Sequence, residues 1–254
     1  MPVELIILFF FVAFLYASAG FGGGSTYLAL LSHFSVGMAG IKLTALLCNI
    51  VVVSGGSWLY IRNKILSLRE ALPFILLSVP MAYIGGLITL DKRLFFSLLG
   101  ITLIVAGISL AITTLPRFQR LATEANEPPH AAISTGIGGS IGLLSGLLGI
   151  GGGIFLSPIL HFMRAYDAKR IAGLASFFIF VNSIAGLIAQ ISKLHSPQPF
   201  YDAMPLAVAV FLGGQLGSRS ALFILNTTAI KRVTALLIFA IGIELTYTYL
   251  ILWK

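Results

Sequence analysis

The hydropathy of this chain alternates between long apolar runs and short polar stretches. A helix that crosses the hydrocarbon core of a bilayer needs about 20 mostly apolar residues. Runs of that length lie at 41–61, 71–90, 94–115, 168–190, 203–225 and 231–251. The pattern therefore predicts a polytopic membrane protein with a transmembrane helix at each of these places.

Two further apolar regions are too long for a single crossing. Residues 3–32 and 132–163 each correspond to roughly 45 Å of helix, against a hydrocarbon core of about 30 Å. Each region contains a glycine run just beyond its middle, at 20–24 (GFGGG) and 149–153 (GIGGG). Several neighbouring glycines remove most of the helix propensity. We expect each region to form a helix that enters the membrane, a break at membrane depth and a short half-helix.

The two halves of the chain match beyond their glycine runs. The matching positions are Asn49 and Asn182, Pro73 and Pro205, and Lys92-Arg93 and Lys231-Arg232. Internal duplication is common in secondary transporters. We therefore expect a first transmembrane repeat over 1–115, a polar linker over 116–131 and a second transmembrane repeat over 132–254.

The distribution of Lys and Arg predicts the orientation. If both long regions cross completely, the basic residues divide almost evenly between the two sides. If each glycine break is the tip of a re-entrant hairpin, one side collects Arg62, Lys64, Arg69, Arg117, Arg120, Arg164, Lys169, Arg170, Lys231 and Arg232. The other side then has Lys42, Lys92, Arg93, Lys193 and Lys254. Basic loops favour the cytoplasm, which predicts a cytoplasmic linker, both termini outside and two inverted repeats.

Composition excludes several classes of protein. The chain is 58% hydrophobic and 9% charged, so its net charge of +8 reflects membrane topology and does not indicate a nucleic-acid partner. One cysteine, Cys48, cannot form an internal disulfide. No phosphate-binding loop, metal-ligand cluster or catalytic triad is recognisable, so we expect no cofactor, no bound metal and no catalytic residues.

Several motifs resemble the TauE/SafE family of sulfite exporters and toluene-sulfonate uptake permeases. The resemblance rests on 146–160 (GLLGIGGGIFLSPIL), Lys169, Ala175-Ser176 and 213–219 (GGQLGSR), and it covers nearly the whole chain. The first half fits less well, because Ala29 stands where the second half has Pro158. The resemblance implies secondary transport of sulfite, sulfonates or other organosulfur anions, in either direction.

The glycine breaks are the first candidate for a substrate site. The start of a half-helix offers up to four free backbone amides and a partial positive charge, which suit a small oxyanion. The candidate substrate-binding residues there are Gly22, Gly23, Gly24, Ser25, Thr26, Gly151, Gly152 and Gly153. Alternatively, these glycines only allow helices to pack closely.

Polar side chains within the predicted spans extend the list of candidates. Asn49, Asn182 and Gln215 could face the substrate, although buried amides also bond across helices. Arg219 could attract an anion, or its side chain could extend to the cytoplasmic surface. Glu244 could take up a coupling proton, or it could lie at the outer interface.

The sequence thus predicts an all-α protein of the cell inner membrane with two repeats, each a glycine-broken re-entrant helix hairpin plus three transmembrane helices. Its expected partners are a small anionic substrate, the lipid bilayer, a coupling proton or cation and, as an option, further copies of the chain. The predicted function is alternating-access transport around the paired half-helices, without enzymatic activity. A passive anion channel and a non-transporting accessory subunit are the alternatives.

Overall fold

The fold is entirely helical over residues 2–33, 38–116, 129–194, 198–223 and 227–251, which the computed structural model describes. The N-terminal half contains α1 (Val3–Ser18), α2 (Gly24–Ser32), α3 (Met38–Arg62), α4 (Leu68–Leu87) and α5 (Lys92–Thr113). The C-terminal half contains α7 (Ala131–Leu148), α8 (Gly153–Phe162), α9 (Ala168–Ile191), α10 (Gln198–Phe223) and α11 (Thr227–Thr246). One π-helical turn, Tyr247–Ile251, extends α11.

Seven helices within the described ranges are long and apolar enough to cross a membrane, namely α3, α4, α5, α7, α9, α10 and α11. Six of these helices coincide with the predicted spans, which confirms a multi-pass membrane protein. The largest difference is at α10, which begins at Gln198 and not at 203, because Pro205 lies inside the helix and does not start it. Most of the predicted linker 116–131 falls on 117–128, outside the described residues.

Both long apolar regions are broken at their glycine runs, as predicted. Helix α1 ends at Ser18 and α2 begins at Gly24, while α7 ends at Leu148 and α8 begins at Gly153. The first break has φ values of 82° at Gly20 and 86° at Gly23. The second break has three left-handed residues within four positions, Gly149, Gly151 and Gly152. Only glycine adopts these angles without strain, so the breaks follow directly from the sequence.

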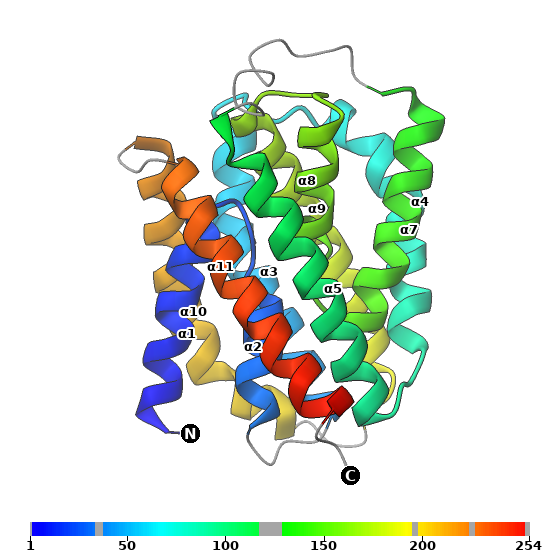
Figure 1. The fold of residues 1–254 in the computed structure, drawn as a ribbon, viewed down its shortest axis with the longest axis vertical. Helices are drawn as coiled ribbons and strands as arrows, with labels where there is room; N and C mark the ends of the chain where they lie inside the picture. The colour runs from blue at the N-terminus through cyan, green and yellow to red at the C-terminus, as the bar shows by residue number, and fades with distance from the viewer. Residues whose placement is uncertain (1, 34–37, 117–128, 195–197, 224–226, 252–254) are drawn as a thin grey trace.

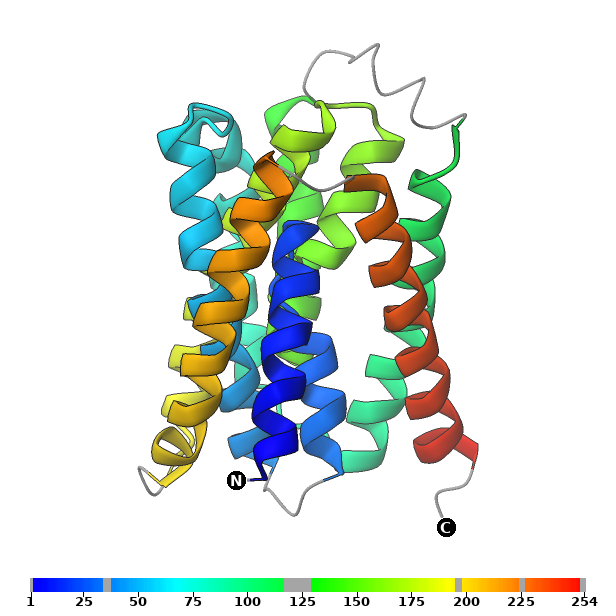
Figure 2. The same ribbon diagram turned by 90° about the vertical axis from the view of Figure 1, so that its left-hand side faces the viewer.

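The two broken helices enter the bundle from opposite ends. In Figures 1 and 2, α1 begins and α2 ends at the lower end of the molecule, whereas α7 begins and α8 ends at the upper end. The start of α1 and the end of α11 both lie at the lower end, and the C-terminal end of α5 lies at the upper end. Each break therefore lies inside the bundle.

The helices pack in pairs that cross between the two halves of the chain. Helix α4 packs along α7, α1 along α10, α5 along α11 and α3 along α9. In addition, α3 contacts α10 and α9 contacts α4. Helices α3 and α9 are the most deeply buried of the spans, and each also contacts one half-helix, α2 or α8.

Glycine allows the α4 and α7 backbones to touch. A Cβ added at Gly138, Gly142 or Gly146 would collide with a backbone carbonyl of α4. These three glycines are four residues apart and so lie on one face of α7, as in the close contacts common between membrane helices. The same kind of contact joins Gly213 and Gly217 of α10 to the backbone of α1.

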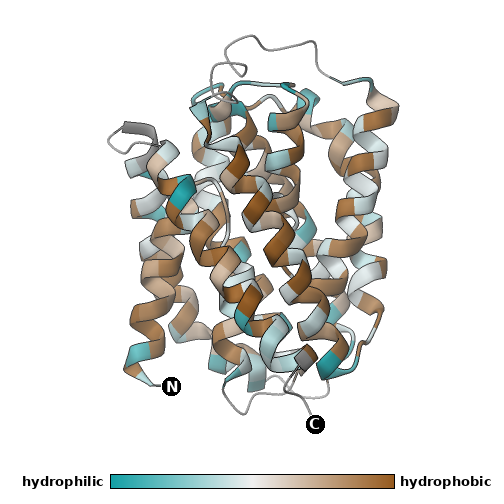
Figure 3. Cartoon of the chain, in the orientation of Figure 1, coloured by the Kyte–Doolittle hydropathy of each residue, from teal (hydrophilic) through white to brown (hydrophobic). Residues whose placement is uncertain are grey.

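The outer surface of the bundle is apolar. Leu76, Val105, Val208 and Leu236 are each more than half exposed on different helices. Figure 3 shows hydrophobic positions along the length of the bundle and hydrophilic positions mainly toward its two ends. Exposed apolar surface of this extent matches a lipid environment. The polar candidates must therefore be sought inside, at the breaks.

Candidate functional site

The two glycine breaks meet at Asn49 of α3. A Cβ added at Gly22 or Gly24 of the first break would collide with the Asn49 carboxamide. A Cβ added at Gly151 of the second break would lie 3.3 Å from Asn49 Nδ2. Asn49 is fully buried, so its amide group lies between the two breaks inside the bundle. The absence of side chains at these glycines is what allows Asn49 to approach both backbones.

Ile179 of α9 forms the other wall of this junction. Its side chain would contact a Cβ at Gly22, Gly151 or Gly153, at 3.3, 2.6 and 2.5 Å respectively. One side chain from α3 and one from α9 thus touch both breaks. Helices α3 and α9 also pack on each other, so Asn49 and Ile179 hold the two breaks against one shared interface.

The half-helix starts direct their backbone amides into the junction. In α2 the N–H of Tyr27 donates to Gly23 O, and in α8 the N–H groups of Phe155 and Leu156 donate to Gly152 O. The amides before these residues belong to the first turns, where an α-helix offers no acceptor of its own. Each helix start also carries a partial positive charge. Two sets of donors therefore border the junction, one beside Asn49 and one beside Ile179.

Several buried polar atoms around the junction have no hydrogen-bond partner within the described part of the chain. They are Ser25 Oγ, both amide atoms of Asn49, Ser145 Oγ and Ser183 Oγ. Ser183 and Ser145 lie against the second break, since Cβ atoms at Gly151 and Gly152 would approach them to 2.9 and 3.1 Å. More than 90% of buried polar groups in proteins are paired. This concentration of unpaired donors and acceptors is typical of a place that receives a polar guest.

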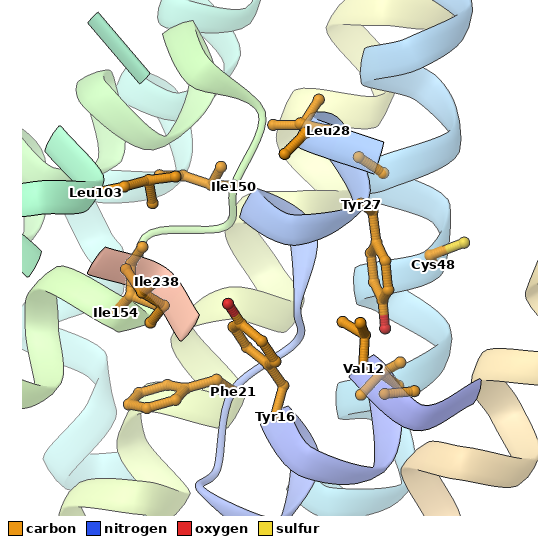
Figure 4. Packing of buried hydrophobic residues seen from close by; sticks show 14 of the residues in the cluster. Val12, Tyr16, Phe21, Tyr27, Leu28, Cys48, Leu103, Ile150, Ile154 and Ile238 are labelled. Carbon is orange, nitrogen blue, oxygen red and sulfur yellow. The ribbon is translucent and has the colours of Figure 1, made fainter. Parts of the chain in front are cut away.

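Thr26 and two tyrosines border the first break. Tyr16 Oη and Thr26 Oγ1 are 2.6 Å apart, and both residues are buried. In Figure 4, the Tyr16 hydroxyl points toward Ile154 of α8, while the Tyr27 ring lies between Val12 and Cys48. The sequence analysis selected Thr26 but not Tyr16. The only sequence signal for Tyr16 was a tyrosine in an apolar run, one turn before the glycines.

The structure does not bring the other predicted residues to this junction. Asn182 is 1% exposed, and its Nδ2 donates to Phe178 O of its own helix. Gln215 of α10 contacts Gly55, which lies six residues beyond Asn49 on α3. Arg219, about one turn beyond Gln215, is exposed. Glu244 lies at the far end of α2, where its Oε1 is 3.1 Å from His33 Nε2.

Lys42 is a residue of the junction that the sequence analysis placed in an outer loop. It lies inside α3, is 5% exposed, and its Nζ donates to Leu147 O at 3.0 Å. Its ammonium also lies 4.4 Å from the centroid of the Phe95 ring. Within the part of the chain that the structure describes, no carboxylate forms an ion pair with Lys42. Among the described residues, its charge is therefore balanced by the Leu147 carbonyl oxygen and the face of the Phe95 ring.

Lys193 lies just beyond the end of α9, close enough to Lys42 for the two charges to repel each other. Its Nζ donates to Gly86 O at 2.8 Å and to Thr89 Oγ1 at 3.3 Å. Partial burial lowers the pKa of Lys193 below its ordinary value. The two lysines are thus a buried cation in the first turns of α3 and a half-buried cation just beyond α9.

The family model described as sulfite exporter TauE/SafE matches residues 5–245. The chain belongs to the TauE/SafE family. It is similar to a probable membrane transporter protein of Sinorhizobium fredii, y4hK, with 30% identity over 96% of this chain and 98% of the relative. It is also similar to the probable membrane transporter protein YunE of Bacillus subtilis, with 25% identity over 80% of this chain and 79% of that protein.

A third relative comes from an archaeon. The probable membrane transporter protein MJ0441 of Methanocaldococcus jannaschii is 26% identical over 74% of this chain and 72% of its own length. No solved structure matches. The TauE/SafE chain is therefore a membrane transporter by family, and its site must be understood from the junction itself.

Proposed function

We propose that this TauE/SafE protein is a secondary transporter of small sulfur-containing anions, such as sulfite or a sulfonate. The observation that carries the proposal is the buried junction at Asn49, where two half-helix starts and several unpaired polar side chains meet. The family description names sulfite export, and the chemistry of the junction suits a sulfur oxyanion. Backbone amides, hydroxyls and one carboxamide can donate to several oxygens without binding them irreversibly.

Lys42 supports an anionic guest. At the second break, the negative end of α7 and the positive end of α8 lie next to each other, so their fields oppose one another. The Lys42 ammonium bonds Leu147 O near the negative end and leaves the positive end of α8 dominant. A site with no carboxylate among its described residues and with a nearby buried cation favours anions over cations.

We further propose that the two halves are inverted repeats, each containing a re-entrant hairpin. The helix pairs support this. If α1, α3, α4 and α5 correspond to α7, α9, α10 and α11, then the α4–α7 pair corresponds to the α10–α1 pair. In the same scheme, α3 packs on α9, which is its own counterpart, and α5 packs on its counterpart α11. Such a set of contacts is expected for two repeats related by a pseudo-two-fold axis in the membrane plane.

The distribution of basic residues assigns the sides of the membrane in this proposal. The end of the bundle where α5 ends and α7 begins faces the cytoplasm, and both termini face outward. The protein is placed in the cell inner membrane. The hairpin α1–α2 then enters from outside and α7–α8 from the cytoplasm, so that their tips meet near the midplane.

Alternating access accounts for the buried position of the junction. Asn49 is 0% exposed and Ile179 is 1% exposed, so the guest must enter by movement of one hairpin or the other. A passive channel requires a continuous wet path instead. Saturable flux that responds to a counter-gradient supports a carrier. Failure of the purified protein to move any sulfur anion would favour the accessory-subunit alternative.

Proteoliposome flux of sulfite, sulfate and methanesulfonate tests the proposal. The decisive variant is Asn49→Asp, which keeps the side-chain shape and places a carboxylate between the two breaks. We expect flux to fall at least about tenfold, the equivalent of about 1.4 kcal/mol of lost anion binding. Asn63→Asp, at an exposed position just beyond α3, is the matched control and should behave as wild type. Equal flux in both variants would reject the site.

A further inference from the structure

Each half-helix ends in a histidine that contacts α11. His161 lies in the last turn of α8, and His33 directly follows α2. The Nδ1 atom of each ring bonds the carbonyl oxygen four residues earlier, Ser157 O at 2.8 Å and Ala29 O at 3.0 Å. Both Nδ1 atoms therefore carry the proton, and each ring presents Nε2 to a neighbouring helix.

The two Nε2 atoms face groups of opposite charge. His161 Nε2 lies 3.0 Å from Lys231 Nζ, near the start of α11. His33 Nε2 lies 3.1 Å from Glu244 Oε1, near the end of α11. Lys231 and Glu244 are separated by 13 residues, which is about 20 Å along the helix axis. In Figure 1, α11 runs from the upper end, where α8 ends, to the lower end, where α2 ends.

The contact at His161 requires a neutral ring. With Nδ1 protonated, Nε2 carries a lone pair that accepts a hydrogen bond from the Lys231 ammonium. A proton added to Nε2 would remove that acceptor and place two positive charges 3.0 Å apart. Lys231 is only 6% exposed, so water screens this repulsion poorly. Protonation of His161 therefore opposes this contact between α8 and α11 as long as Lys231 keeps its charge.

The contact at His33, in contrast, requires an added proton. Its Nδ1 faces a carbonyl and its Nε2 faces a carboxylate, and both of these groups are acceptors. The two hydrogen bonds form together only when the His33–Glu244 pair holds an added proton, on the imidazole or on the carboxyl group. Protonation therefore strengthens the contact between α2 and α11, and loss of the proton weakens it.

The other charged groups near these contacts are engaged elsewhere or lie on neighbouring helices. Arg232 turns to Thr114 beyond the end of α5. Arg170 of α9 pairs with Asp167 and Glu70, and Lys169 precedes it on α9. Of the helices packed on α2, α1 carries Glu4 and α3 carries Lys42 and Arg62. None of these contributes an ion pair to either histidine within the described residues.

We propose that the proton is the coupling ion of this transporter, and that His161–Lys231 and His33–Glu244 are its two binding sites. A proton from the linker side binds His161 Nε2 and loosens α8 from α11. A proton at His33–Glu244 tightens α2 onto α11 at the side of the termini. Protonation thus biases the protein toward opening at the linker side and closing at the side of the termini. This inference rests on the proposed transport function and adds its coupling ion.

The test measures protons and anions in the same proteoliposomes, with a pH dye inside and an anion gradient across the membrane. Methanesulfonate and sulfate are fully ionised near neutral pH, so protons that accompany them are moved by the protein. Sulfite is tested in parallel. Bisulfite carries the same number of protons in every variant, so the protons moved per sulfite are compared between each variant and wild type. The variants are His161→Gln, a neutral side chain that can still accept from Lys231, and Glu244→Gln. His130→Gln, at the exposed residue before α7, is the control.

We expect wild type and His130→Gln to move protons in proportion to the anion. His161→Gln should retain anion exchange at pH 7.5 and lose at least about fivefold in protons moved per anion, within the usual range of coupling between sites. Glu244→Gln should lose coupling similarly. Unchanged proton movement in His161→Gln would overturn the inference. If only Glu244→Gln leaves proton movement unchanged, then His33–Glu244 is not a second proton-binding site. If wild type moves none of the three anions, the transport function itself is wrong.

Discussion

Lys42 Nζ donates a hydrogen bond to Leu147 O across 105 residues of sequence, at 3.0 Å. This bond joins the start of α3 to the last turn of α7, directly before the second glycine break. The Lys42 side chain also lies near Gly149, whose Cβ position would be 3.7 Å from Lys42 Cγ. A buried cation thus lies at the negative end of the broken helix.

Replacing Lys42 with methionine should weaken anion binding. The methionine fills a similar volume but leaves Leu147 O and the negative end of α7 unneutralised near the guest. We expect the KM for the transported anion to rise about tenfold, the equivalent of about 1.4 kcal/mol. Lys64→Met, at an exposed residue after α3, is the control for loss of a positive charge. A KM that rises equally in both variants would contradict a local role for Lys42.

Replacing Gly24 with alanine should displace Asn49. The added Cβ would overlap the Asn49 carboxamide, so this side chain must leave its position between the two breaks. We expect binding of sulfite or methanesulfonate to the detergent-solubilised protein, measured by calorimetry, to weaken at least about tenfold. Gly136→Ala is the matched control, because nothing lies within 4 Å of a Cβ there. Wild-type affinity in Gly24→Ala would exclude Asn49 from the site.

A single methyl group added at the interface between α4 and α7 should lower the stability of the protein. A Cβ at Gly146 would collide with Ala82 O, a backbone atom that cannot rotate away. Overpacking of this kind typically costs about 1–3 kcal/mol. Gly146→Ala should therefore lower the unfolding temperature in detergent, followed by tryptophan fluorescence. Gly136→Ala on the same helix should maintain or raise it, because Ala stabilises helix interiors by about 1 kcal/mol relative to Gly.

Two buried tyrosines provide a matched pair for the first break. Tyr16→Phe removes the 2.6 Å hydrogen bond to Thr26 Oγ1 and leaves that hydroxyl unpaired in the junction. Tyr27→Phe removes a hydroxyl that has no partner among the described residues. A buried hydrogen bond contributes about 1 kcal/mol. We expect Tyr16→Phe to raise the KM several-fold and lower thermal stability, and Tyr27→Phe to change neither. The reverse order of effects would contradict the role assigned to Tyr16.

The elements of the fold were predictable because their causes are local in the sequence. An apolar run of about 20 residues indicates a span wherever it occurs. The left-handed φ angles at Gly20, Gly23, Gly149, Gly151 and Gly152 are available to glycine regardless of its neighbours. The sequence by itself therefore determined the spans, the two breaks and the donors that the breaks release.

Only the tertiary structure decided which side chains lie at the junction. Asn49 lies against both breaks because α3 packs along α9, and Lys42 reaches Leu147 of α7 through its long side chain. His161 and Lys231 are 70 residues apart and meet only because α8 ends beside the start of α11. The sequence made Gln215, Arg219 and Glu244 equally good candidates for the site, yet the structure places them away from the junction. Which faces of the helices meet depends on glycine seams and side-chain packing between distant segments, and no local pattern specifies it.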